Sequence, residues 1–595
     1  MTSATIAARL REARTGVAIG KDEVALGALS LFASALALLT WQTWGDLDSD
    51  TGYDTLAGIH VARGELPYVD FVYYYGPLSA FLSGLAAFVG GDGFGPSVAL
   101  GLGLTAAILA ATYALARVVA GTVGALLAAA LTAAVAFIPD NYSFVLPHTF
   151  AAPLGTLLVL LLLLSVWRYA ETERPAWLLT AGVLLGLTTL TKPEAAGAAV
   201  VAVMIWLVIR RRLTSRDALV VLAPAVVIPA VVYGAFAAAA GASDLLFKNL
   251  YPVDSFEVAR STMLEARMPM TVGSLADLVG KLVLYAVGVS ALIVLALLLS
   301  RPGRLRSAAL AVCCIAATGV VAVSIARPDG LRDAAVYMYG WIPAGAILAA
   351  VLVVRRARRD GTAPPSSVQL EAAGVAALAV LAATTYASFV VHGWRPQMAV
   401  YYLPLAAIFL ARLHLVELAP GRPGRVLGVL WLSFLVASAA GLTLKAAGDE
   451  SVVVRGPGGA LAETPVEARA YERALQWIAA ETEPGDPILV APLMTALHPL
   501  SGRETPLQEL TTVPGALPTD ADEREAIRRL ETAGVRLAIT DRRRWPGYGH
   551  GAFGTTFHGR LSDWIDTNFA RVTVIRSGSG EDTRTFDVWL KRRDP

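Results

Sequence analysis

The chain has 595 residues, of which 55% are hydrophobic and 16% charged, and its mean hydropathy is +0.58. Soluble globular proteins carry about 25% charged residues, so this composition excludes an ordinary soluble protein and indicates a chain that crosses a membrane many times. The formal net charge of +2 gives no support for nucleic-acid binding. The two cysteines, Cys313 and Cys314, are adjacent within an apolar run, which argues against a disulfide framework or a cysteine metal site.

The first apolar run, residues 24–44, follows a basic segment that holds Arg9, Arg11, Arg14 and Lys21. This start is similar to a signal peptide, but the run is long and no small-residue cleavage site follows it. We therefore expect an uncleaved first span with residues 1–23 in the cytoplasm.

The apolar runs that follow predict a membrane part over residues 24–444. They are 97–116, 121–138, 149–167, 176–191, 195–209, 218–240, 279–300, 307–325, 335–354, 370–390, 398–416 and 426–444. With the first run they amount to about thirteen transmembrane helices. The fold class predicted is thus a mainly α membrane protein.

The segment 78–89 is apolar but short and rich in glycine. If it does not cross the membrane, most arginines between the apolar runs fall on the cytoplasmic side, as the positive-inside rule requires. Those arginines are Arg117, Arg168, Arg174, 210–212, Arg301, Arg304, Arg306, Arg355, Arg356, Arg358, Arg359, Arg422 and Arg425. We therefore expect segment 78–89 to be a helix that lies along the outer membrane surface.

From about residue 445 the composition becomes that of a soluble domain, which an odd number of spans places outside the cell membrane. Predicted helices at 466–480 and 523–532, the second capped by Asp520 or Asp522, alternate with predicted strands at 487–491, 535–540, 570–575 and 585–590. This pattern indicates a small extracytoplasmic α/β domain over residues 445–595. The glycine-rich stretch 455–459 lacks the strand-to-helix context of a phosphate loop and is interpreted as a linker.

The first outer loop, residues 45–96, concentrates acids: Asp46, Asp48, Asp50 and Asp54 lie within nine positions. One interpretation is a solvated anionic loop that caps the following helix, 54–63. A calcium loop is a second interpretation, although the twelve-residue pattern with its terminal Glu is absent.

The stretch DSDTGYD, followed by AxxVxxGExPYxDFxYxYGPL, resembles the first extracytoplasmic loop of GT-C superfamily glycosyltransferases, including protein O-mannosyltransferase-like and aminoarabinose-transferase-like proteins. Asp50 matches the acidic position that supplies the catalytic carboxylate in that group, and 76–78 (Gly-Pro-Leu) matches an element that opens a surface helix. Thr51 stands where Glu is common, so a two-acid mechanism at this dipeptide is not implied. Asp48 is the nearest competitor as the base.

The resemblance also implies substrate-binding residues. Tyr53 and Asp70 stand in the same loop motif, and Asp140 matches a second acidic position. His148 could bind a phosphate or a metal, with an interfacial loop among lipid headgroups as the alternative. Lys192 matches a Lys-Pro element near the lipid phosphate; the alternatives are snorkelling and pairing with Glu194.

These features predict transfer of a sugar from a polyprenyl-phosphate donor to a cell-envelope acceptor at the outer face of the plasma membrane. A carboxylate of the first loop would act as general base. The predicted partners are the donor, the acceptor and the bilayer. No cofactor is predicted, and a divalent metal is not supported by a clear motif. A transporter or flippase of a lipid-linked glycan and a non-catalytic cell-envelope assembly protein remain alternatives.

Overall fold

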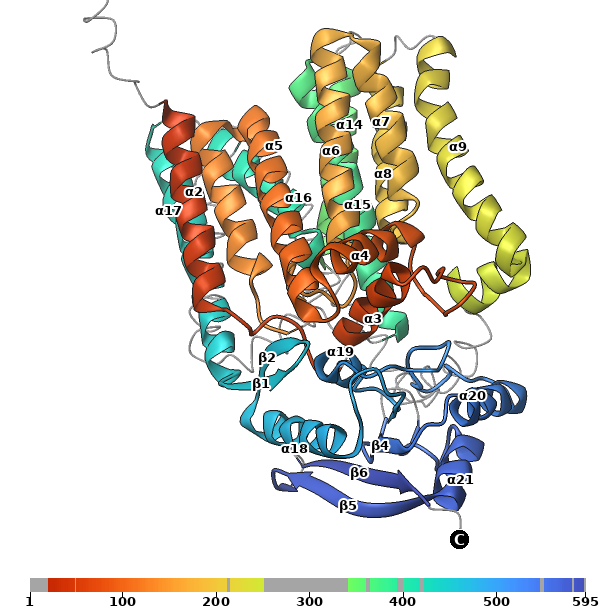
Figure 1. The fold of residues 1–595 in the computed structure, drawn as a ribbon. Helices are drawn as coiled ribbons and strands as arrows, with labels where there is room; N and C mark the ends of the chain where they lie inside the picture. The colour runs from red at the N-terminus through yellow and green to blue at the C-terminus, as the bar shows by residue number, and fades with distance from the viewer. Residues whose placement is uncertain are drawn as a thin grey trace, which may run out of the picture.

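The computed structural model describes residues 20–48, 50–140, 142–210, 215–250, 341–359, 364–392, 400–417, 422–545, 550–580 and 583–592. The predicted spans 279–300 and 307–325 lie outside these ranges. The described chain is mainly helical, with long helices at one end of the molecule and a smaller α/β part at the other (Figure 1).

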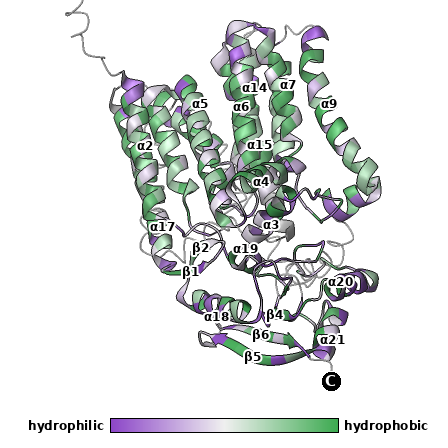
Figure 2. Cartoon of the chain, viewed as in Figure 1, coloured by the Kyte–Doolittle hydropathy of each residue, from purple (hydrophilic) through white to green (hydrophobic). Residues whose placement is uncertain are grey.

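The long apolar helices form the membrane part. They are α2 (Lys21–Leu39), α5 (Phe94–Ala136), α6 (Ala151–Thr172), α7 (Pro175–Thr188), α8 (Pro193–Arg210), α9 (Ser215–Ala240), α14 (Trp341–Arg359), α15 (Ser366–His392), α16 (Leu403–Arg412) and α17 (Arg422–Asp449). Two π-helical turns, η1 (Asp244–Leu250) and η3 (Leu413–Glu417), follow α9 and α16. Figure 2 shows hydrophobic residues along these helices and hydrophilic residues at their ends.

Among the described residues, seven helices are long and apolar enough to cross a bilayer. This confirms a multi-pass membrane protein, whereas the count of about thirteen stays a prediction. The predicted span 97–116 and all but the last two residues of 121–138 fall in α5, which is kinked at Gly121, where φ is +74°. A left-handed residue cannot continue a right-handed helix, so the kink divides α5 near the predicted boundary.

Two short helices occupy the first loop: α3 (Asp50–Ala62) and α4 (Pro77–Gly90). The fourteen residues of α4 span about 21 Å, less than the ~30 Å of a bilayer core. In agreement with the prediction that this segment is not a span, α4 lies crosswise to the long helices (Figure 1). Its small residues face α3, and Leu85, Phe88 and Val89 are exposed.

The C-terminal part contains two sheets. Strands β1 (Val452–Gly456) and β2 (Gly459–Glu463) form an antiparallel hairpin, so the glycine-rich stretch 455–459 is a turn and not a linker. The second sheet has the order β3-β4-β6-β5, with β3 (Leu489–Ala491) parallel to β4 (Leu537–Asp541), and with β5 (Phe569–Ser577) and β6 (Arg584–Lys591) antiparallel.

The helices of this part are α18 (Pro465–Glu481), α19 (Leu497–Ser501), α20 (Asp520–Thr532) and α21 (Gly559–Asn568). The N-cap of α20 is Thr519, not Asp520 or Asp522. Asp522 occupies the N3 position, the third residue of the helix, and is the partner of Thr519 in a capping box. The side chain of Asp522 accepts from the backbone N–H of Thr519, which is the reciprocal bond that such a box needs.

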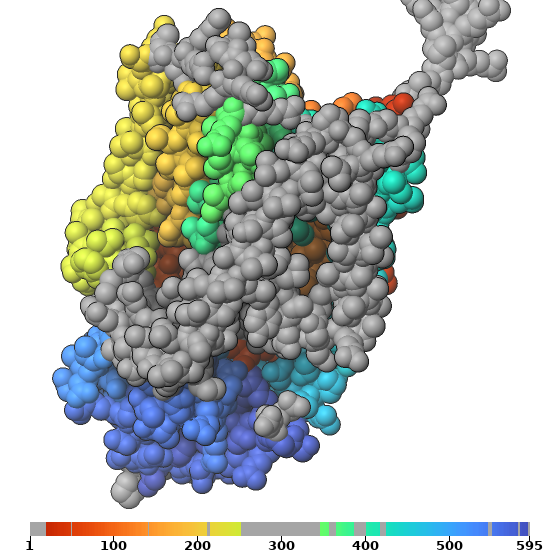
Figure 3. Space-filling model, turned by 180° about the vertical axis from the view of Figure 1, so that it is seen from behind, coloured from red at the N-terminus to blue at the C-terminus, as the bar shows by residue number. Residues whose placement is uncertain are grey.

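The C-terminal part packs directly against the end of the membrane part that carries α3 and α4 (Figures 1 and 3). The backbone N–H of Phe94 donates to Gly458 O at 2.8 Å, and that of Ala462 donates to Gln42 O at 2.7 Å. One continuous hydrophobic core includes helix residues such as Phe94 together with Leu461 and Leu497. A second core lies between the larger sheet, α20 and α21.

Candidate active site

Four segments that are distant in the sequence meet at the loop end of the membrane helices. They are the first turns of α3, the loop before α6, the turn between α7 and α8, and the residue pair before α16. They bring together Asp50, Asp54, His148, Lys192 and Tyr401. Three of these five residues were candidates from the sequence.

The turn that carries Lys192 is locked against the first loop. The N–H of Gly76 donates to Thr191 O at 2.7 Å, and that of Leu78 donates to Leu190 O at 3.1 Å. A Cβ at Gly76 would come within 2.2 Å of Leu190 O, so no other residue fits there. The Gly-Pro-Leu element therefore fixes the lysine turn and also satisfies an unpaired N–H at the start of α4.

Lys192 is buried, with 6% of its surface exposed. Its ammonium lies 3.0 Å from Glu194 Oε1, 3.3 Å from His148 Nε2 and 5.4 Å from the centre of the Tyr75 ring. The pairing with Glu194 is the one the sequence suggested, but snorkelling is wrong because the side chain is enclosed. A buried ammonium needs such partners to offset its lost hydration.

His148 is 2% exposed, so an interfacial loop among headgroups is the wrong interpretation. Burial holds the pKa of His148 well below its ordinary value, and the charge of Lys192 acts in the same direction. An ammonium only donates, so Nε2 accepts from Lys192, and the proton of the neutral ring is on Nδ1. Nδ1 then donates to the hydroxyl of Tyr401 at 3.3 Å.

Asp50 is the first residue of α3 and is half-buried. Burial and the charge of Asp54 raise the pKa of Asp50 to about 6, although Lys192 opposes the rise. The carboxyl group therefore has the strength of a general base that works near neutral pH. Asp50 thus lies within reach of the charge of Lys192, and its role as the base stays a prediction.

Asp54 was not a candidate from the sequence, where it was interpreted as the start of a helix. It lies one turn after Asp50 and is 1% exposed. Its carboxylate accepts from the Tyr73 hydroxyl at 2.6 Å and from the Phe150 N–H at 2.8 Å. Burial raises the pKa of Asp54 to about 6 despite these bonds. The i, i+4 spacing of the two acids was the signal that could have identified it.

Tyr53 is buried, and its hydroxyl donates to Val72 O at 2.8 Å. Its ring stacks on Tyr73 and Tyr74 with ring centres 6.0 and 5.8 Å apart. Tyr53 is thus part of the packing under α3, not a free substrate contact. Tyr73 is fully buried as well.

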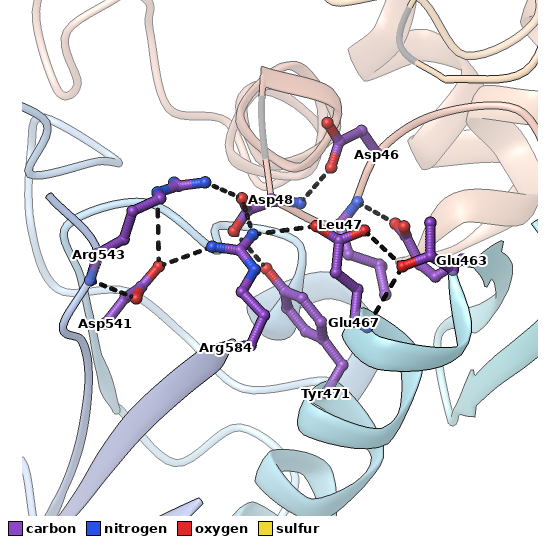
Figure 4. Close-up of polar contacts among 10 residues, drawn as sticks. Asp46, Leu47, Asp48, Glu463, Glu467, Tyr471, Asp541, Arg543 and Arg584 are labelled. Carbon is purple, nitrogen blue, oxygen red and sulfur yellow. Dashed lines mark hydrogen bonds and ion pairs between the residues drawn. The ribbon is translucent and has the colours of Figure 1, made fainter. Parts of the chain in front are cut away.

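Asp48 lies elsewhere, in an ion network with the C-terminal part (Figure 4). Arg543 and Arg584 both pair with its Oδ2, and the Tyr471 hydroxyl donates to Oδ1 at 2.8 Å. Burial raises the pKa of Asp48, but the two arginines outweigh it and leave the pKa below its ordinary value. This position favours a structural role for Asp48 over a catalytic one.

Asp140 and Asp70 both contact the first outer loop. Asp140 has φ +74°, and its carbonyl accepts from the Gly45 N–H at 3.1 Å. The pKa of Asp46 is raised mainly by burial and secondly by the charge of Asp140. Asp70 is exposed and accepts from the Leu66 N–H at 2.7 Å. It borders a cavity of about 240 Å³ between the end of α3 and residues 498–508.

Asp46 and Asp140 have acidic neighbours from the C-terminal part, among them Glu450 and Glu463. Burial and the surrounding acids raise the pKa of Glu450 to about 9. Within the described ranges, no group of three or more His, Cys, Asp or Glu side chains is arranged to hold a metal ion.

Residues 75–234 match the family described as dolichyl-phosphate-mannose-protein mannosyltransferase. The match covers His148 and Lys192 and supports the resemblance to GT-C superfamily membrane glycosyltransferases. No curated protein matches the chain.

Solved structures with similar folds include the oligosaccharyltransferase of Archaeoglobus fulgidus in the apo form, at 14% identity and a TM-score of 0.46, covering 87% of this chain and 69% of that one. The same enzyme in complex with an inhibitory peptide and a dolichol-phosphate is 14% identical, with a TM-score of 0.46 and coverages of 92% and 72%. ArnT from Cupriavidus metallidurans bound to undecaprenyl phosphate is 13% identical, with a TM-score of 0.42 and coverages of 94% and 98%.

Proposed function

We propose that this GT-C superfamily membrane protein transfers a sugar from a polyprenyl-phosphate donor to a hydroxyl group of a cell-envelope acceptor. The observation that supports this most directly is the proximity of Lys192 to Asp50, which lies within reach of the lysine charge. A buried ammonium lies close enough to a carboxyl group of raised pKa, at the end of the membrane helices, for the ammonium charge to act on that pKa. Phosphate departure and hydroxyl deprotonation need these two groups.

Lys192 is the candidate for the donor phosphate. Its ammonium contacts Glu194 and His148, and an oxygen of the donor phosphate would replace one of these partners. As the bond between the sugar and the phosphate breaks, negative charge grows on the phosphate. A fixed ammonium that is shielded from water stabilises that charge.

Asp50 is the candidate base. It is half-buried and remains accessible, whereas the carboxylate of Asp54 is enclosed and occupied by Tyr73 and Phe150. Asp50 would take the proton of the acceptor hydroxyl while the oxygen of that hydroxyl bonds to the anomeric carbon. The bond from that carbon to the phosphate oxygen breaks, and the polyprenyl phosphate leaves with the electron pair.

The site faces the cell exterior in this proposal. An N-terminus in the cytoplasm, about thirteen spans and an extracytoplasmic C-terminal part follow from the arginine distribution. Nucleotide sugars are absent outside the cell, so a lipid-linked donor suits this orientation. The plasma membrane of a bacterium is the proposed location.

A bond-cleavage assay separates this function from its alternatives. Purified protein is mixed with radiolabelled polyprenyl-phosphate mannose or arabinose and a cell-envelope extract. A transferase releases free polyprenyl phosphate and labels the extract only when both substrates are present. A flippase moves the intact donor across vesicle bilayers without cleavage, and an assembly protein does neither. Transfer of label by the wild type that is lost in Asp50→Asn would support the proposal. A donor that stays intact with wild-type protein would contradict it.

A further inference from the structure

We propose that the C-terminal part is a positioning element for the transfer reaction, in which Arg543 and Arg584 hold Asp48 and so fix the start of α3. This inference rests on the proposed function, because it concerns the residue offered above as the base. The ion network of Figure 4 would then position α3 as well as stabilise the fold. We call Asp48 with its two arginines the α3 clamp.

The α3 clamp joins chain segments that are far apart. Arg543 follows strand β4, Arg584 begins strand β6, and Asp48 precedes α3. Both arginines also contact Asp541, with Arg584 Nη1 3.2 Å from its Oδ2. Arg584 Nη2 lies 3.3 Å from Glu467 Oε1 as well. Acidic side chains of the C-terminal part therefore hold each arginine in position for its contact with Asp48.

The α3 clamp is buried. Its ion pairs are therefore little screened by water, and removing one partner destabilises the structure. The side chains of Asp48 and Arg584 are each 10% exposed, and that of Asp541 is 1% exposed. Removing one partner of a buried pair leaves the other charge without hydration or a counter-ion. The loop that carries Asp48 would then move toward water instead of staying in place.

Further contacts press the same stretch onto the C-terminal part. The N–H of Leu47 donates to Glu463 Oε1 at 2.8 Å. At Gly52 a Cβ would lie 2.2 Å from the backbone nitrogen of Ala496 and 2.6 Å from the carbonyl carbon of Thr495. Only glycine permits so close an approach of α3 to this backbone. The residues on both sides of Asp50 are thus held by the C-terminal part.

The consequence for the site is the environment of Asp50. Its pKa is raised first by burial, then by Asp54, and is lowered by Lys192; Tyr74 and Tyr75 are further neighbours. Neither arginine of the clamp is among these influences. The clamp therefore acts on Asp50 through position and burial. Releasing it should admit water and return the carboxyl group toward ordinary acidity.

A labelling experiment tests position without any need for activity. In full-length protein with Cys313→Ser and Cys314→Ser, Thr51→Cys places a thiol in the first turn of α3, where the native side chain is 2% exposed. Labelling by an impermeant maleimide should be slow, and Arg584→Gln should speed it at least tenfold. Arg542→Gln is the matched control, because Arg542 pairs with Asp587 and not with Asp48.

A pH profile supplies the second readout, one that a loss of stability alone would not move. Arg584→Gln should shift the acidic limb of kcat/KM below that of the wild type, toward pH 4, because Asp50 becomes hydrated. A direct through-space loss of positive charge would shift the limb upward. Arg584→Lys, which keeps one cationic contact, should restore most of the wild-type limb. If Arg584→Gln does not fold, Asp48→Asn is used in its place.

The results separate the two proposals. Equal labelling rates in the Arg584 and Arg542 variants, or an unmoved acidic limb in the Arg584 variant, overturn the positioning role. Faster labelling in Arg584→Gln with no transfer by the wild type supports the clamp and rejects the glycosyltransferase function. Faster labelling together with a lowered limb supports both.

Discussion

The Nζ of Lys192 lies 3.3 Å from Nε2 of His148, and both side chains are almost fully buried. The neutral imidazole accepts a hydrogen bond from the ammonium, and its Nδ1–H donates to the hydroxyl of Tyr401. His148 thus holds the ammonium on one side. Asp50 and Asp54 lie close enough for the lysine charge to oppose the rise in pKa that burial causes in both.

Lys192→Met should weaken binding of a polyprenyl-phosphate sugar at least tenfold. A charge-assisted hydrogen bond contributes about 1.5–3 kcal/mol, and methionine keeps the bulk without the charge. Donor affinity is measured by equilibrium binding to purified protein. Lys445→Met, an exposed position in α17, is the control. Equal affinities in the two variants would return Lys192 to a purely structural pairing with Glu194.

Asp50→Asn should lower turnover by about 10²–10⁴-fold, the usual contribution of a general base. Donor affinity should hardly change, because the carboxylate does not hold the phosphate. Single-turnover transfer of radiolabelled sugar measures the first effect. Asp92→Asn, an exposed acid of the same loop that pairs with Arg63, should retain activity. Full activity in Asp50→Asn with loss in Asp48→Asn would reassign the base.

Transfer activity should depend on pH with an acidic limb near 6. Burial raises the pKa of Asp50 from 3.8 to about 6, so below that value the base is protonated and idle. The same shift predicts that Asp50 lowers the free energy of unfolding as pH rises from about 4 to 6, because the folded state releases its proton later. Thermal unfolding of wild type and Asp50→Asn across this interval measures the effect. A wild-type stability that rises more steeply than that of the variant would contradict it.

Tyr401→Phe should weaken donor binding by about two- to twelvefold, since one neutral hydrogen bond contributes about 0.5–1.5 kcal/mol. The lost hydroxyl leaves Nδ1 of His148 without this acceptor, so the imidazole orients Lys192 less well. A double-mutant cycle with Lys192→Met tests the connection. If the two effects add without coupling, Tyr401 does not act through the lysine.

Two introduced cysteines test the proposed orientation. Ser215 is the exposed first residue of α9, and Ser579 is exposed between β5 and β6. In intact cells an impermeant thiol reagent should label Ser579→Cys and not Ser215→Cys. The reverse pattern would invert the topology inferred from arginine placement.

Much of the helical part was predictable because long apolar runs have few folded alternatives in a bilayer. Asp50 and Lys192 could each be named as candidates through a resemblance and an intramembrane charge. Burial depth was not accessible, so the sequence left open an interfacial position for His148 that its 2% exposure excludes. The partners of Asp48 lie 495 and 536 residues further along the chain, and no local pattern indicates such pairs.

The α3 clamp also imposes an order in time. Asp48 is synthesised 536 residues before Arg584, which at ~5–20 residues per second corresponds to roughly 30–110 s on the ribosome. Through that interval the membrane helices insert while the start of α3 lacks its counter-charges. A nascent chain therefore has its cation and its carboxyl groups in place but not yet the seat for α3. If the proposed function holds, an unfinished chain would therefore be a poor catalyst of transfer.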